Sequence, residues 1–229
     1  MSFTLGTPPA QLSDALLERL RRVSFPTLGH YLEEGFLDPA IQRQCGRGRV
    51  VGRAISVRLT GQDSTVLHHA AGHCRPGDVF VIDTGGDTRH APVGEVLAVT
   101  LHARGAVGVV IDGVMTDLDQ VEPLGLPVYA RGRSVLTTKL LHLDAGGLHV
   151  PVSVGGVTVT SGDVVLADRN GVFAAAPAVV EALVDTALAD DAEEPALLAE
   201  VLAGARLGDL TGATAAIESL LAERGTTAS

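Results

Sequence analysis

Two short runs made up of apolar residues and glycine constrain the fold of this chain more than any other feature. Val79–Ile82 and Val107–Ile111 both have the length of a strand, and a run without polar side chains is typical of a strand covered on both faces. The segment between them that begins at Gly94 and Glu95 has the pattern of a helix, and Gly105 is a natural stop for it. This order of strand, helix and strand predicts a parallel β-α-β unit.

Other predicted elements surround this unit. Helices are expected over residues 11–23, from residue 24 to about 35, over 63–73 and over 117–124, and strands over 47–60 and 126–130. From Leu148 to Ala176 short apolar segments alternate with turn signals, which predicts antiparallel hairpins. The expected fold class is therefore α/β, with a mixed parallel and antiparallel core, helices outside it and a helical C-terminal tail.

The predicted domain organisation is one domain over residues 1–176 and a helical acidic tail over residues 177–229. From Glu181 to the end, the tail holds ten Asp or Glu against two Arg, which is typical of a solvated acidic face. We expect this tail to pack on the same domain or on a neighbouring subunit.

Charge and composition exclude several classes of protein. A formal net charge of −10 argues against a nucleic-acid partner held through its phosphates. No apolar run reaches the roughly 18 residues that a membrane-spanning helix needs, and residues 1–17 lack the basic and apolar regions of a signal peptide. Cys45 and Cys74 have no metal-binding spacing and form no disulfide framework. The sequence therefore predicts a cytoplasmic protein that binds neither membrane nor nucleic acid.

Acidic residues stand where predicted strands and helices meet. Glu95 opens the helix of the β-α-β unit and Asp117 follows its second strand, so both fall on one edge of the sheet and are expected to converge. The first amides of that helix, with Gly94 before them, are able to bind a carboxylate or phosphate. Asp117 suits a hard cation such as Mg²⁺ or Mn²⁺, which takes one or two carboxylates and fills its other positions with water and substrate. Structural roles are also available, since Glu95 can stabilise the helix dipole and Thr116 can cap the next helix.

Three other features bear on the chemistry. His69 and His73 lie four residues apart and would share a helix face, as a pair of metal ligands does, but no third ligand completes a motif. His90, in the loop before the helix, is a candidate acid or base. Lys139, the only lysine, is a candidate Schiff-base residue, although nothing in the sequence around it indicates a desolvated pocket.

Three segments together resemble the RraA-like family: GEVLAVTLHARGAVGVVIDGVMTD (94–117), DLDQVEPLGLPVYARG (117–132) and VPVSVGGVTVTSGDVVLADRNGVFAAAP (150–177). This family includes 4-hydroxy-4-methyl-2-oxoglutarate aldolases, which also decarboxylate oxaloacetate, and regulators of ribonuclease E activity. The resemblance implies a swivelling β/β/α sandwich that assembles as a homotrimer or a dimer of trimers, with sites between subunits.

The family's aldolase signature is an acidic residue, twenty intervening residues and then Arg-Asp. Here Glu95 and Asp117 fill the outer positions, and Asp117 matches the carboxylate that binds the divalent metal. Thr116 occupies the arginine position. In the family this arginine holds the carboxylate and oxygen of the pyruvyl group, and losing such a donor typically costs about 10²–10³-fold in rate. The candidates to replace it from neighbouring loops are Arg89, Arg131 and Arg133.

The resemblance thus implies a divalent-metal-dependent lyase that cleaves a small 2-oxo acid, by retro-aldol reaction or decarboxylation, and gives pyruvate. Asp117 would bind Mg²⁺ or Mn²⁺, with Glu95 and Asp83 ordering its water shell. Because Thr116 replaces arginine, a related metal-assisted lyase or tautomerase step stays open. The substrate-binding candidates are Gly94, Val96, Leu97 and His90. The alternative is a non-catalytic relative that binds a protein partner, as the ribonuclease regulators do.

Overall fold

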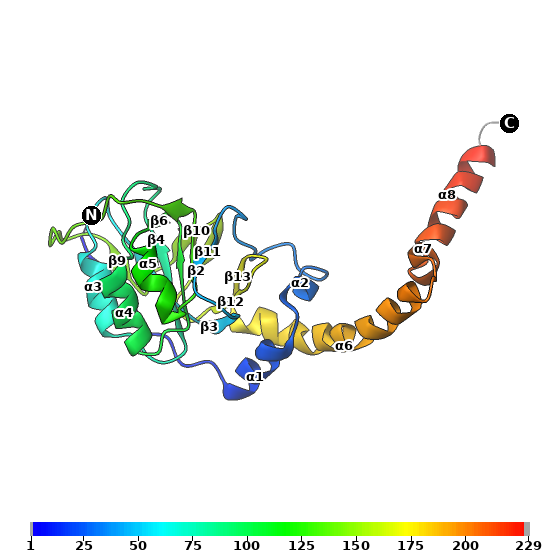
Figure 1. Ribbon diagram of the computed structural model, residues 1–229, viewed down its shortest axis with the longest axis horizontal. Helices are drawn as coiled ribbons and strands as arrows, with labels where there is room; N and C mark the ends of the chain where they lie inside the picture. Colours follow the sequence, from blue (N-terminus) through cyan, green and yellow to red (C-terminus); the bar gives the residue numbers. More distant parts are fainter. Residues whose placement is uncertain (1, 227–229) are drawn as a thin grey trace.

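A mixed β-sheet forms the centre of the structure, a computed structural model that describes residues 2–226 (Figure 1). Four strands run parallel and side by side: β3 (Val50–Arg58), β4 (Asp78–Asp83), β5 (Gly108–Ile111) and β7 (Val128–Ala130). Three more pair antiparallel with them: β2 (Gln42–Cys45) on β7, and β9 (Gly147–Leu148) and β12 (Val164–Ala167) on β3. The remaining strands are β1 (Thr4–Leu5), β6 (Val114–Met115), β8 (Gly132–Arg133), β10 (Val152–Val154), β11 (Val157–Val159) and β13 (Val172–Ala175). The predicted mixed α/β class is confirmed.

The central strands are covered on both faces. One face carries α3 (Thr65–Gly72), α4 (Glu95–Ala103), α5 (Leu118–Val121) and the short 3-10 helix η1 (Glu122–Leu124). Phe80 and Ile82 of β4 belong to the apolar core beneath these helices. Val79 and Val81 point the other way, into a second core shared with the antiparallel hairpin β10–β11. The alternation explains why this strand is apolar throughout, as the sequence predicted.

A third apolar core joins the N-terminal helices to the start of the C-terminal helix. Its helices are α1 (Asp14–Arg22), α2 (Phe25–Leu28) and α6 (Pro177–Leu202). Leu20 of α1 packs with Val180, Val184 and Ala187 of α6, and all four side chains are buried. The first three turns of α6 therefore pack on the body of the protein, although the sequence analysis assigned them to the tail that begins at residue 177.

Asp190 and Asp191 of α6 still bind Tyr31, Ser24 and Thr27, and beyond them α6 becomes an arm, which α7 (Leu207–Leu210) and α8 (Ala213–Thr226) continue (Figure 1). Pro195 lies inside α6, where it removes one backbone hydrogen bond and favours a bend. Among residues 2–226 there is no helix both long and apolar enough to cross a membrane.

One predicted helix is shorter in the structure, and one edge strand was not predicted. The helix expected from residue 24 to about 35 ends at Leu28, where the amides of Gly29 and His30 donate to the carbonyls of Pro26 and Thr27, three residues back. Further along, Gly35 adopts a left-handed conformation, φ +91°, and a β-carbon there would lie 2.7 Å from the Phe173 ring. The strand β2 was not predicted at all. It reads Gln-Arg-Gln-Cys and lies at the edge of the sheet, so it lacks the apolar alternation by which strands are recognised.

Candidate functional site

The amino end of α4 and the residue after β6 meet at the edge of the sheet, as their positions in the sequence predicted. An oxygen of the Asp117 carboxylate, Oδ2, accepts a hydrogen bond of 2.9 Å from the backbone amide of Glu95. The backbone amide of Thr116 donates to the carbonyl of Val93 at 2.9 Å. Asp117 thus caps α4 across a separation of 22 residues, and the β-α-β unit closes on itself at this point.

Gly94 is required for this close approach. A β-carbon on residue 94 would lie 2.4 Å from Oδ2 of Asp117 and 2.8 Å from Cγ2 of Thr116. Asp117 itself is left-handed, with φ 54° and ψ 42°, a conformation that Asp tolerates better than most side chains do. The contact therefore depends on the residue types at both positions.

A pocket of about 240 Å³ opens beside this contact. Six of its lining residues are among the predicted site residues: Gly94, Glu95, Val96, Leu97, Thr116 and Asp117. The rest of its wall is made of Ser64, His68, Ala91, Pro92 and residues 137–140. The structure thus collects most of the predicted site in one cavity.

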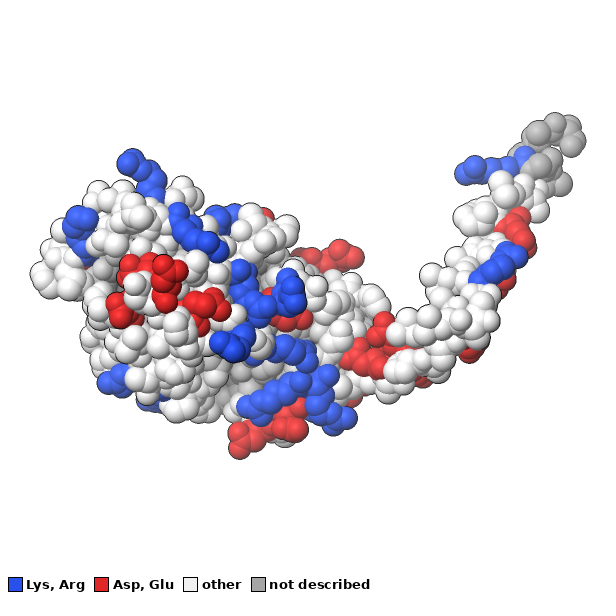
Figure 2. Space-filling model, viewed as in Figure 1, with Lys and Arg blue, Asp and Glu red and all other residues white. Residues whose placement is uncertain are grey.

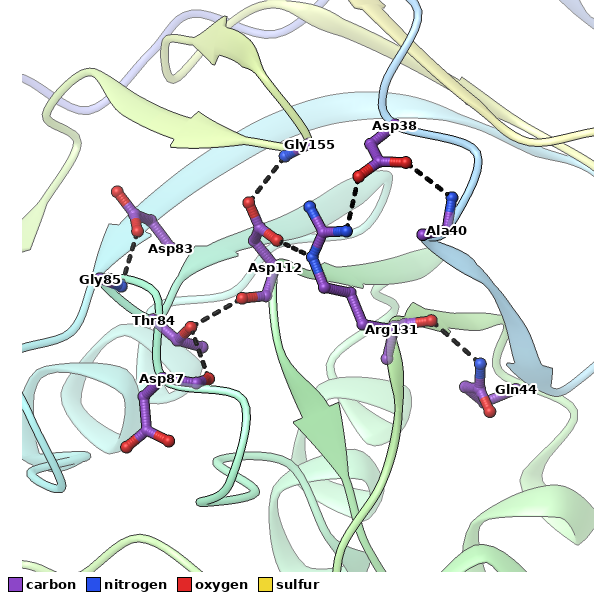
Figure 3. Close-up of polar contacts among 11 residues, drawn as sticks. Asp38, Ala40, Gln44, Asp83, Thr84, Gly85, Asp87, Asp112, Arg131 and Gly155 are labelled. Atoms are coloured by element: carbon purple, nitrogen blue, oxygen red, sulfur yellow. Dashed lines mark hydrogen bonds and ion pairs between the residues drawn. The ribbon is translucent and has the colours of Figure 1, made fainter.

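Two predicted residues, Asp83 and His90, do not line this pocket. Oδ1 of Asp83 accepts from the amide of Gly85 at 2.8 Å (Figure 3). Its Oδ2 accepts from the amide of Ser153 in the β10–β11 hairpin at 3.3 Å. Nδ1 of His90 lies 2.6 Å from Oδ2 of Asp87. Each side chain has a local structural partner, and the roles predicted for them in water ordering and substrate binding remain predictions.

Lys139 also lines the pocket, although its surroundings in the sequence did not indicate a desolvated site. Its Nζ donates to the carbonyl of Thr137 at 3.1 Å, and the side chain is exposed in the cavity wall. Its backbone is fixed on both sides, because its amide donates to Gln62 at 2.8 Å and its carbonyl accepts from the amide of Ser64 at 2.9 Å. An exposed amine is not the desolvated lysine that Schiff-base chemistry favours, but it places a positive charge in the pocket.

The loop that carries Lys139 is anchored by Asp63, whose side chain is 4% exposed. Its carboxylate accepts from the amides of Leu141 at 3.0 Å and Leu143 at 2.9 Å, and from both the amide and the hydroxyl of Thr65. Burial by itself would raise the pKa of Asp63, but the hydrogen bonds from Thr65, Leu143 and Leu141 outweigh it and lower the pKa to about 2.

Acid is expected to destabilise the protein through Asp63. Its folded-state pKa lies below the ordinary 3.8, so the stabilisation is complete above about pH 4 and is lost as the pH falls toward about 2. The difference corresponds to about 2 kcal/mol of unfolding free energy. Urea unfolding between about pH 4 and pH 2 measures this loss. In Asp63→Asn the fall in unfolding free energy over this range should be smaller than in the wild type by about 2 kcal/mol. The control Asp119→Asn, at an exposed position, should show the same fall as the wild type. Equal slopes for Asp63→Asn and the wild type would contradict the assignment.

None of the three arginines considered as replacements at position 116 lines the pocket. Arg131 binds Asp112 through Nε and Asp38 through Nη1, the latter at 2.6 Å, and Asp112 also accepts from the amide of Gly155 (Figure 3). Nε of Arg133 donates to Oε1 of Gln44 at 3.2 Å. Arg131 and Arg133 are therefore held by partners outside the pocket, which leaves Lys139 as the cation in its wall.

The donors around Asp117 suit a hard cation held mainly by water and substrate. Across residues 2–226, no three His, Cys, Asp or Glu side chains gather into a metal-binding group, and His69 and His73 stack at 4.5 Å on a different pocket. Oδ1 of Asp117 is 3.3 Å from the Thr116 hydroxyl and is not used by the Glu95 amide. Acidic side chains also gather over α5 (Figure 2). Oδ1 of Asp117 accepts a hydrogen bond from the Thr116 hydroxyl, and its position beside Glu95 fits the coordination habit of Mg²⁺ and Mn²⁺.

Comparison with known proteins places this fold and sequence among described relatives. A family model described as Aldolase/RraA matches residues 9–174. A Shewanella oneidensis protein provisionally named 4-hydroxy-4-methyl-2-oxoglutarate aldolase is 34% identical over 146 residues, or 62% of this chain and 86% of the relative. A Halalkalibacterium halodurans protein with the same provisional name is 33% identical over 124 residues, 54% of this chain but only 58% of the relative's length. The solved structure of Streptomyces coelicolor RraAS2, described as an unusual member of the RNase ES inhibitor RraA protein family, gives a TM-score of 0.72 at 25% identity, over 84% of this chain and 99% of that one.

Proposed function

This chain belongs to the RraA-like family, and we propose that it is a metal-dependent lyase that cleaves a carbon–carbon bond in a small 2-oxo acid and releases pyruvate. The observation that carries the proposal is the convergence of the α4 amino end, Asp117 and Lys139 on one pocket. The provisional aldolase names of the relatives support the same reaction class.

The substrate's carboxylate would bind at the amino end of α4. The amides of Val96 and Leu97 are in the first turn, where backbone N–H groups lack partners within the helix and the helix dipole favours an anion. Gly94 leaves the approach to these amides free of a side chain. A carboxylate therefore requires no arginine to be held at this end of the pocket.

Asp117 would hold the divalent cation through Oδ1, and Glu95 would order the water around it. When bound, such a cation polarises a keto oxygen and stabilises the negative charge that develops there as the carbon–carbon bond breaks. The hydrogen bond from the Glu95 amide keeps the Asp117 carboxylate in position before the substrate arrives. Asp117 thus needs little reorganisation during the reaction.

Lys139 would supply the positive charge that Thr116 does not. An ammonium group on a flexible stem can stabilise the carboxylate and the developing enolate, although it lacks the planar fork of arginine. The anchoring of its loop by Asp63 keeps the ammonium close to the cavity. We therefore assign Lys139 to substrate binding, and not to a covalent intermediate.

The proposal is tested by measuring pyruvate release from 4-hydroxy-4-methyl-2-oxoglutarate and from oxaloacetate, with Mg²⁺ or Mn²⁺ and after chelation. Release that is abolished by chelation and restored by the metal is the expected result. A wild type inactive on both substrates, with activity appearing only in Thr116→Arg, would overturn the aldolase assignment and point to a repurposed pocket. The non-catalytic alternative is not favoured, because Asp117, the carboxylate proposed to bind the metal, lines the pocket and is positioned by the Glu95 amide and the Thr116 hydroxyl.

Lys139→Met is expected to lower kcat/KM for pyruvate release by about 10²-fold, because the pocket then has no cation in its wall. Adding Thr116→Arg to Lys139→Met should recover at least about tenfold, since it returns a charge to the other side of the cavity. Arg133→Met removes a charge held outside the pocket by Gln44 and serves as the matched control. Equal losses in Lys139→Met and Arg133→Met would show that Lys139 has no specific role.

A further inference from the structure

A cavity separate from the Asp117 pocket lies near the amino end of β4. It measures about 260 Å³, and the N-terminal segment, β9 and α3 come together around it (Figure 1). The two cavities share no lining residue, so this one lies outside the proposed reaction site. Its apolar wall is formed by Leu5, Pro8, Pro9, Ile55, Ala70 and Leu148.

Three imidazoles and an exposed guanidinium also line this cavity. His69 lies on α3 and His73 at its carboxyl end, and their rings are 4.5 Å apart. His149 follows β9. The backbone amide of Arg75 donates to Asp78, but within residues 2–226 no hydrogen bond or ion pair engages its guanidinium. The Arg75 side chain is therefore available to a ligand.

The cavity has no free negative charge to match these groups. Within residues 2–226, Asp78 is the only acidic residue in its wall, and both carboxylate oxygens are engaged. Oδ1 accepts from Nε of Arg53 at 3.1 Å and also from Nη2, and Oδ2 accepts from the amide of Arg75 at 2.8 Å. Arg53 and Asp78 neutralise each other, so Arg75 and any protonated imidazole leave the cavity with a net positive charge.

The imidazoles can respond to an anion by taking up protons. Nδ1 of His73 donates to the carbonyl of His69 at 2.9 Å, so its Nε2 carries a proton only when the ring is charged. Burial lowers the pKa of His149, and the charge of Arg53 lowers it further. His73 and Arg75 act in the same direction, and Asp78 opposes them. A bound anion favours the charged ring, so binding should strengthen as the pH falls.

We propose that this cavity binds a small organic anion with a carboxylate head and an apolar body. The guanidinium of Arg75 matches a carboxylate in bidentate geometry, and the imidazoles add donors once protonated. The apolar wall then covers the body of the ligand. Since a cavity of about 150 Å³ holds benzene, one of about 260 Å³ has room for a ring and its carboxylate. The site does not depend on the reaction proposed for the pocket beside Asp117.

Benzoate is the probe for this site, titrated into the full-length chain without added metal. NMR of the imidazole Cε1–H groups locates it, because the neighbours His68 and His69 line different pockets. We expect saturable shifts at His69, His73 and His149 and none at His68. Shifts at His68 alone would place benzoate in the pocket beside Asp117 and overturn the proposal, as would the absence of any saturable shift.

Two analogues separate the head of the ligand from its body. Benzyl alcohol keeps the ring without the charge, and acetate keeps the carboxylate without the ring. Each should bind at least about tenfold more weakly than benzoate, as measured by calorimetry. Acetate binding as tightly as benzoate would contradict the role of the apolar wall, and benzyl alcohol binding as tightly would contradict the role of the charge.

The pH dependence tests the imidazoles. From about pH 8 to about pH 6, benzoate stays ionised and its binding should tighten about threefold or more. His149→Asn should reduce this change, because Asn does not titrate. It tolerates the left-handed backbone of residue 149, φ 56°, and can replace the contact with Ser161. Affinity that is the same at both pH values would exclude the imidazoles from the site.

Matched arginine variants test the guanidinium. Arg75→Gln should weaken benzoate binding by about tenfold, because a charge-assisted pair is lost. Arg47→Gln removes an exposed arginine outside the cavity and should leave the affinity unchanged, although it alters the net charge equally. Urea unfolding checks that each variant is folded. Equal affinities in Arg75→Gln and Arg47→Gln would show that Arg75 does not hold the anion and would contradict the proposal.

Discussion

Asp117→Asn is expected to lower pyruvate release by about 10³-fold while leaving the protein folded. Asparagine keeps an oxygen that can accept the Glu95 amide, and it tolerates the left-handed backbone of residue 117. It removes the negative charge that would hold a divalent cation, and therefore the largest electrostatic contribution that we propose for the reaction. Steady-state kinetics over a range of Mg²⁺ or Mn²⁺ concentrations measures the loss, and urea unfolding measures the stability.

Asp117→Ala distinguishes the two roles of this residue. It should be as inactive as Asp117→Asn and also less stable by about 1 kcal/mol, because the cap on α4 is lost as well. If Asp117→Asn retained activity within tenfold of the wild type, Asp117 would be a capping residue alone and the metal mechanism would be wrong.

Asp78→Ala is expected to lower the unfolding free energy by about 3–5 kcal/mol. Arg53 and Asp78 form an ion pair whose side chains are 3% and 1% exposed, with Nε of Arg53 at 3.1 Å from Oδ1. The same guanidinium donates to the carbonyls of Pro9 and Ala10 at 2.9 and 3.0 Å. Removing Asp78 leaves a buried, uncompensated charge beside β3 and β4, which urea unfolding at an unchanged m-value would reveal.

Two further variants test the origin of that loss. Replacing both partners, with Arg53→Met and Asp78→Leu, should cost less than Asp78→Ala alone, since no unpaired charge remains. Asp185→Ala breaks an exposed pair with Arg19 and should cost less than about 1 kcal/mol. Equal losses in Asp78→Ala and Asp185→Ala would show that burial of the pair contributes nothing.

Local signals in the sequence were sufficient for the centre of the fold and for much of the pocket. Val79–Ile82 is apolar because both of its faces are buried, and the turn residues between 148 and 176 mark hairpins that the structure contains. The convergence of Glu95 and Asp117 follows from parallel strands, whose carboxyl ends meet at one edge of a sheet.

Features that rest on long-range contacts could not be predicted in this way. Lys139 lies at the pocket because its backbone is hydrogen-bonded to Gln62 and Ser64, and because the buried Asp63 anchors the residues that follow it. No local sequence pattern indicates these contacts. The sequence likewise did not show that Arg131 is committed to Asp38 and Asp112, which come from distant parts of the chain. The only indication in the sequence was that Lys139 is the single lysine, and this does not show which residues surround its side chain.

The contact between Gly94 and Asp117 also limits how this pocket can evolve. Any side chain at position 94 would strike the carboxylate, and any residue at 117 without an acceptor would uncap α4, so neither position can change first without loss. The Lys139 side chain is under no such constraint, because it takes no part in the contact that closes the β-α-β unit. The pocket can therefore change at position 139 more readily than at positions 94 and 117.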